Sequence, residues 1–76
     1  MNASRIAFIG GGNMAAALIG GMVKDAPEGA RPSIVVADPN EDRRQSLRDQ
    51  LGVEVTGDNH AAIDGAQLVV LAVKPQ

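Results

Sequence analysis

Apolar residues along this chain fall into four short runs that are separated by longer and more polar stretches. The runs cover residues 5–10, 33–37, 53–55 and 67–73. Continuous apolar runs of this length are typical of strands in a parallel sheet whose two faces are both covered. They predict four strands. The last run is the most apolar stretch of the chain and is expected to lie centrally in the sheet.

The stretches between the runs favour helices. Residues 13–24 are apolar on almost every side, so this helix is expected to be buried on more than one side. Residues 40–51 combine an inward apolar stripe with charged side chains that are mostly solvated. A brief third helix is predicted over residues 59–65, with Asn59 as its cap.

The order of these elements predicts an α/β fold. Strands that alternate with helices form parallel sheets with right-handed crossovers. We expect a Rossmann-like sheet with strand order 3-2-1-4 and helices on both faces, which is the first half of a doubly wound domain. A chain of 76 residues allows one small domain, so residues 1–76 form a single predicted dinucleotide-binding domain.

A glycine motif of the form G-x-G-x-x-A joins the first strand to the first helix. Gly10 lets the chain leave the strand in a tight turn, and Gly12 lets a pyrophosphate approach the backbone closely. Ala15 is small enough for the helix to lie against the strand. The unpaired N–H groups and the positive dipole end of that helix would face the phosphates. This context predicts binding of a dinucleotide.

Asp38 admits two roles. It lies 23 residues after Ala15, near the separation of about 20 residues at which a carboxylate meets the adenosine ribose, and its charge there would favour NAD. Residues 38–41 are also typical of a helix start, with Asp38 as N-cap, proline at N1 and glutamate at N3. Arg43 and Arg44 provide either a partner for the 2′-phosphate of NADP or a solvated helix face. The choice between NAD and NADP stays open at this point.

Composition narrows the function classes. A net charge of −2 provides no basic surface for a nucleic-acid backbone. The single aromatic residue, Phe8, provides almost no side-chain surface on which bases could stack. No apolar run approaches the roughly 20 residues of a membrane span, and no signal peptide precedes the first strand. The chain has no cysteine, which agrees with a reducing compartment, and we expect a cytoplasmic protein. No catalytic constellation and no metal-ligand spacing is present, so neither a catalytic residue nor a metal is predicted.

Two segments resemble the amino-terminal domain of the pyrroline-5-carboxylate reductases. Members of that family typically read F-I-G-x-G-N-M in the first loop and A-V-K-P after the fourth strand. Here residues 8–14 read F-I-G-G-G-N-M and residues 72–75 read A-V-K-P. The resemblance covers the whole chain. Imine reductases and F420-dependent NADP oxidoreductases share the architecture and are near neighbours.

The resemblance implies a reductase that converts 1-pyrroline-5-carboxylate to L-proline with NADPH or NADH. It also implies a helical carboxyl-terminal domain that holds the substrate and forms the homo-oligomer, so we expect these 76 residues alone to be inactive and at most weakly associating. The implied cofactor contacts are Ile9, Gly10, Gly11, Gly12, Asn13, Met14, Asp38, Asn40, Asn59, Ala72, Val73, Lys74 and Pro75.

One departure and one alternative accompany this interpretation. Many relatives have an uncharged hydroxyl residue at the position of Asp38, which leaves the preference for NADP in question. The alternative function is a dinucleotide-binding module that senses its ligand without catalysis. The A-V-K-P segment favours the reductase, because a sensor has no need to shape the nicotinamide end of the ligand.

Overall fold

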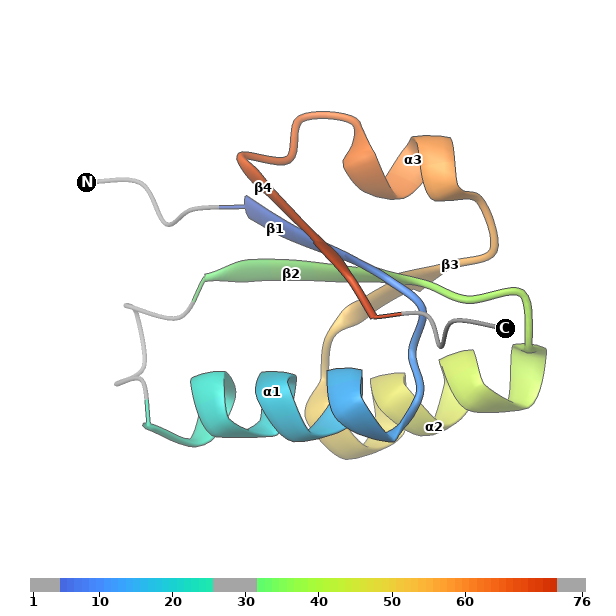
Figure 1. The fold of residues 1–76 in the computed structure, drawn as a ribbon. Helices are drawn as coiled ribbons and strands as arrows, with labels where there is room; N and C mark the ends of the chain where they lie inside the picture. The colour runs from blue at the N-terminus through green and yellow to red at the C-terminus, as the bar shows by residue number, and fades with distance from the viewer. Residues whose placement is uncertain (1–4, 26–31, 73–76) are drawn as a thin grey trace.

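Strands and helices alternate along residues 5–25 and 32–72, which are the residues that the computed structural model describes (Figure 1). The elements are, in chain order, β1 (Arg5–Ile9), α1 (Asn13–Asp25), β2 (Ser33–Ala37), α2 (Glu41–Leu51), β3 (Glu54–Thr56), α3 (Asn59–Ile63) and β4 (Leu68–Leu71). The predicted sequence of elements is confirmed, with boundaries that move by at most two residues.

The strands form one parallel sheet in the order β3-β2-β1-β4, as predicted. In β1, Ile6 is in register with Ile34 of β2 on one side and with Leu68 of β4 on the other. The shift of β3 by one residue relative to the prediction follows from pairing, because Glu54 is in register with Val35 of β2.

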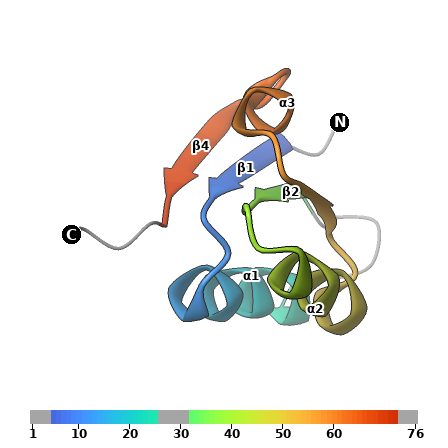
Figure 2. The ribbon, with the colours of Figure 1, turned by 90° about the vertical axis from the view of Figure 1, so that its right-hand side faces the viewer.

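Helices cover both faces of the sheet. Helices α1 and α2 lie on one face and α3 lies on the other (Figures 1 and 2). Successive side chains of a strand point to opposite faces, so Phe8 packs with the core beneath α1 and α2, whereas Ala7 packs towards α3. The face below α3 is built from small or β-branched residues, and Ala62 of α3 is fully buried there.

Helix α1 is buried on one face only in the described structure, so the prediction of burial on several sides is wrong. Ala15 and Ile19 are fully buried against the sheet, whereas Met14 is 57% exposed and Leu18 is 47% exposed. Apolar residues around the whole helix identify an apolar surface, but they do not identify what covers each part of it.

Strand β4 lies at an edge of the sheet, so its predicted central position is also wrong. Among the described strands it pairs only with β1, because the order 3-2-1-4 places the last strand outermost. Leu68 is 54% exposed and Leu71 is 70% exposed as a result. Within residues 5–25 and 32–72, no helix combines the length and the apolar character needed to cross a bilayer.

Candidate functional site

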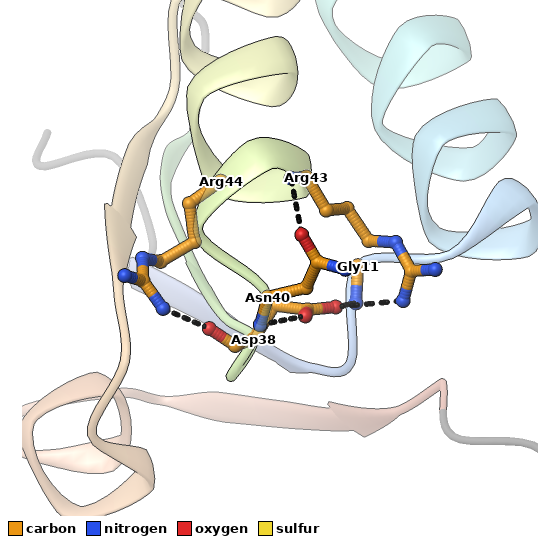
Figure 3. A network of polar contacts seen from close by, with 5 residues as sticks. All are labelled: Gly11, Asp38, Asn40, Arg43 and Arg44. Carbon is orange, nitrogen blue, oxygen red and sulfur yellow. Dashed lines mark hydrogen bonds and ion pairs between the residues drawn. The ribbon is translucent and has the colours of Figure 1, made fainter.

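The turns that follow β1 and β2 lie next to each other at the carboxyl edge of the sheet (Figure 3). The backbone N–H of Gly10 donates to the carbonyl oxygen of Ala37 at 2.8 Å, which ties the end of the first strand to the end of the second. In open parallel sheets this edge is where ligands bind.

The first two positions of the turn require glycine for different structural reasons. Gly10 has a φ of 99°, a conformation that residues with a Cβ rarely adopt, so its predicted role in a tight turn is confirmed. A Cβ added to Gly11 would lie 2.6 Å from Cδ1 of Leu47 and 3.2 Å from Oδ2 of Asp38. Gly11 is therefore required because the loop packs tightly against α2 and the end of β2.

Gly12 is the opposite case. A Cβ added there would meet no atom within 4 Å, so packing does not require this glycine. The carbonyl oxygen of Gly12 accepts the first helical hydrogen bond of α1, from the N–H of Ala16 at 3.0 Å. Gly12 is thus the N-cap residue, and it has no side chain with which to satisfy the first N–H groups of the helix.

The other two helices show what α1 lacks. The side chain of Asn40 accepts from the N–H of Arg43 at the start of α2, and that of Asp58 accepts from the N–H of His60 at the start of α3. No acidic residue lies in the first turn of α1. An anion at the start of α1 therefore meets uncapped N–H groups and the positive end of the helix dipole.

Asp38 is buried and accepts three hydrogen bonds (Figure 3). Its side chain is only 2% exposed. Oδ2 accepts from the N–H of Gly11 at 2.8 Å and from the guanidinium of Arg43 at 3.2 Å, and Oδ1 accepts from the N–H of Asn40 at 2.8 Å. Burial alone would raise the pKa of Asp38, but these three donors outweigh it and hold the pKa below its ordinary value.

The predicted helix start at residues 38–41 is wrong in its details. Asn40, not Asp38, is the N-cap of α2, and the helix begins at Glu41. The carboxylate of Asp38 turns back to the glycine loop, so it is not available to the N–H groups of α2. Asp38 and Asn40 both belong to residue types that cap helices, and the contact with Gly11 decides between them.

Two arginines from the first turns of α2 flank Asp38 on opposite sides (Figure 3). Arg43 contacts the carboxylate, and half of its side chain remains exposed. Arg44 donates to the backbone carbonyl oxygen of Asp38 at 2.7 Å, and its guanidinium lies against Gly57. Neither arginine is simply part of a solvated helix face.

A groove of about 400 Å³ runs between the start of α1 and the exposed side of α2. The glycine loop and Asn13 form one wall, and Asn40, Asp42 and Arg43 lie on the other. The groove thus joins the uncapped N-terminus of α1 to the polar start of α2.

The remaining predicted site residues are only partly brought together. Ile9 ends β1, and its carbonyl oxygen accepts from the N–H of Ala72 at 2.8 Å, so the ends of β1 and β4 adjoin. Asn59 is the first residue of α3 and is exposed, and its predicted capping role is wrong because Asp58 is the cap. Val73, Lys74 and Pro75 lie outside the described residues.

Sequence reasoning missed two features of this site. The packing role of Gly11 has a weak signal, since a third glycine stands between the two that the motif needs. The contact of Arg44 with the backbone of Asp38 has no sequence signal, because every residue has a carbonyl oxygen that a donor side chain can reach. In the part of the chain with a described structure, no group of three acidic or histidine side chains is placed to hold a metal ion.

Comparisons with known proteins agree with this geometry. Residues 5–76 match the family described as NADP oxidoreductase coenzyme F420-dependent. The whole chain is 42% identical over 76 residues to a pyrroline-5-carboxylate reductase of Pseudomonas aeruginosa and 41% identical over 76 residues to one of Vibrio alginolyticus, covering 27% of each relative. It is 45% identical over 71 residues, 93% of this chain, to 25% of a pyrroline-5-carboxylate reductase of Haemophilus influenzae. The chain thus spans about a quarter of the length of these relatives.

Proposed function

This chain belongs to the family of NADP oxidoreductases described as coenzyme F420-dependent, and from that premise we propose that it is the cofactor-binding part of a pyrroline-5-carboxylate reductase. In this proposal the whole protein reduces 1-pyrroline-5-carboxylate to L-proline with NADPH or NADH, in proline biosynthesis. The similarity along the whole chain to proteins named pyrroline-5-carboxylate reductase supports the substrate.

The uncapped start of α1 is the observation that carries the binding role. The space beside Gly12 is open, and the N-cap position has no side chain, so a pyrophosphate can reach the N–H groups of Asn13 and Met14. A side chain at Gly12 would extend into the same space. These features fit the diphosphate of a nicotinamide dinucleotide.

The roles of the cofactor and of the protein are assigned from the residues that the chain contains. The bound nicotinamide supplies the hydride, and the protein supplies binding and orientation. We assign the pyrophosphate to residues 9–14, and we place the nicotinamide end near Ala72, where β4 ends beside β1. Asn40 and Asn59 are proposed to contact the adenosine half. We assign no catalytic residue to these 76 residues, and we place the imine substrate against a further helical domain.

Calorimetric titration with NADPH and NADH tests the proposal. We expect Gly12→Val to weaken the binding of both dinucleotides by about tenfold or more, because the valine side chain occupies the space of the pyrophosphate. The fold should survive, since an added Cβ meets nothing within 4 Å and Gly12 does not have a positive φ.

Gly21→Val is the matched control. Gly21 lies on the exposed side of α1, and an added Cβ there also meets nothing within 4 Å, but it is two turns away from the loop. We expect Gly21→Val to bind like the wild type. Equal affinity of Gly12→Val and Gly21→Val would refute a pyrophosphate site at this loop. In the same preparations, NADPH and 1-pyrroline-5-carboxylate together should give no turnover.

A further inference from the structure

We infer that Asp38 is a positioning residue for the pyrophosphate loop: its buried carboxylate holds the N–H of Gly11 and so fixes the backbone that leads into the open start of α1. This inference rests on the proposed function, and it assigns a role that the spacing of the sequence did not suggest. Asp38 then serves the diphosphate of the ligand through the loop, and does not contact the hydroxyl groups of the ribose.

A loop of three consecutive glycines needs to be held from outside. Glycine has more backbone freedom than any other residue, so a loop of this kind loses more entropy than other sequences when a ligand orders it. The backbone holds its two ends, since Gly10 donates to the carbonyl oxygen of Ala37 and the carbonyl oxygen of Gly12 accepts the first hydrogen bond of α1. A side chain holds the middle residue, Gly11, through the bond of 2.8 Å to Oδ2 of Asp38.

Both oxygens of Asp38 take part in this arrangement. Oδ2 accepts from the N–H of Gly11 and Oδ1 accepts from the N–H of Asn40, each at 2.8 Å, so one side chain joins the glycine loop to the turn before α2. Both oxygens are pure acceptors only when the group is ionised. Burial raises the pKa of Asp38, but its hydrogen bonds outweigh this effect and keep the pKa below the ordinary value. A side chain without acceptors would leave both N–H groups unsatisfied.

The negative charge of Asp38 does not itself favour an anion in the groove. Like charges repel, so a carboxylate near the pyrophosphate opposes binding to the extent that its charge is exposed. This carboxylate is 2% exposed, and its third donor is the guanidinium of Arg43 at 3.2 Å (Figure 3). The same burial keeps a ribose hydroxyl from reaching it. Removal of the charge would strengthen the binding of an anion, so a loss of affinity on removing Asp38 would report the position of the loop.

Titration with ADP and 2′,3′-dideoxy-ADP tests the inference, because these ligands share the diphosphate and differ in the ribose hydroxyl groups. Asp38→Ala and Asp38→Leu both remove the two acceptor oxygens, and the leucine also keeps the shape of the side chain. Each variant should weaken both ligands by the same factor of about ten. Asp42→Ala, the matched control, removes an exposed carboxylate from the other wall of the groove and should bind both ligands at least as tightly as the wild type.

Hydrogen exchange of single amides tests the same contact without a ligand. In the folded Asp38 variants, the N–H of Gly11 should exchange about tenfold faster than in the wild type, because its acceptor is gone. The N–H of Gly10, which bonds to the carbonyl oxygen of Ala37 at 2.8 Å, should keep its rate. Asp38→Leu fills the space that Asp38→Ala leaves empty, so it provides the comparison if Asp38→Ala does not fold.

Three results would overturn the inference although the proposed function stands. Wild-type affinity for 2′,3′-dideoxy-ADP in the Asp38 variants would show that the loop needs no support from this side chain. A loss confined to ADP would show that Asp38 contacts the ribose hydroxyl groups instead. Equal acceleration of exchange at Gly10 and Gly11 would indicate a general loosening of the fold. If the wild type binds neither NADPH nor NADH, the proposed function itself fails.

Discussion

Three consecutive glycines have three different surroundings in the turn after β1. Gly10 adopts a positive φ, Gly11 has no room for a side chain, and Gly12 has open space beside it. The motif predicted the first of these features, because it depends on local geometry, and the approach of a pyrophosphate to the third glycine stays a prediction. The second depends on Leu47, a buried residue of α2 whose position the sequence pattern near Gly11 cannot indicate.

Asp38 shows the same limit for a polar residue. The spacing of the sequence allowed a ribose contact or a helix cap, and the structure adds a contact that neither alternative contained, with the N–H of Gly11. That hydrogen bond links residues 27 positions apart. It couples the glycine loop to the turn between β2 and α2, which no local pattern could predict.

The depressed pKa of Asp38 predicts acid sensitivity of the fold. Its pKa in the folded chain is below the ordinary value, because the hydrogen bonds from Asn40, Gly11 and Arg43 outweigh the opposing effect of burial. The unfolded chain therefore binds this proton more readily. The stabilisation is fully present above the unfolded pKa, about 3.9, and is lost as the pH falls towards the folded pKa.

Urea unfolding at pH 7 and at pH 3 measures this loss. Asp38→Asn removes the titrating group, so we expect its free energy of unfolding to fall less between these two pH values than that of the wild type. Asp49→Asn, an equal charge change at an exposed position of α2, should keep the wild-type loss. Wild-type acid sensitivity in Asp38→Asn would show that other carboxylates dominate.

At the scale of elements, periodicity predicted helices and strands well and their surroundings poorly. Every predicted element is present, because each needs only a run of suitable residues and a local start or stop signal such as Gly52, which ends α2 with a φ of 68°. The burial of α1 and the place of β4 depend on which elements pack beside them. That information is not contained in the periodicity of either segment.

Helix α3 provides a test at this scale, because two adjacent residues suit the cap. Asp58 accepts from the N–H of His60 at 2.9 Å, whereas Asn59 is exposed as the first helical residue. We expect Asp58→Ala to lower the free energy of unfolding by about 1 kcal/mol, the usual cost of losing an N-cap. Asn59→Ala should change it by less than about 0.5 kcal/mol.

The same pair separates stability from binding. If Asn59 contacts the adenosine half of the cofactor, as we propose, Asn59→Ala should weaken NADPH binding in calorimetry while urea unfolding stays unchanged. A loss of stability in Asn59→Ala as large as that in Asp58→Ala would show that Asn59 also caps the helix. Unchanged NADPH affinity in Asn59→Ala would remove this residue from the proposed site.

At the scale of the whole molecule, the described structure has an edge strand with unpaired backbone groups and exposed apolar side chains. Strand β4 bonds to β1 alone among the described strands, and Figure 2 shows it at the outer side of the sheet, on the same side as α1. Its residues Leu68–Leu71 include neither a charge nor a proline, the two devices that commonly protect an edge strand. Met14 and Leu18 add exposed apolar surface on α1.

This surface predicts weak, concentration-dependent association of the 76-residue chain. Unpaired N–H and C=O groups along an uncharged edge are a template for another strand, and the exposed leucines add apolar area to the contact. Leu71 is 70% exposed, so Leu71→Lys should suppress association at little cost in stability. Gln50→Lys, the same added charge at an exposed position of α2, should not suppress it.

Sedimentation velocity over a wide range of concentrations should show a weight-average mass that rises for the wild type and for Gln50→Lys and stays monomeric for Leu71→Lys. A wild-type chain that remains monomeric throughout would show that the open edge of β4 does not mediate association.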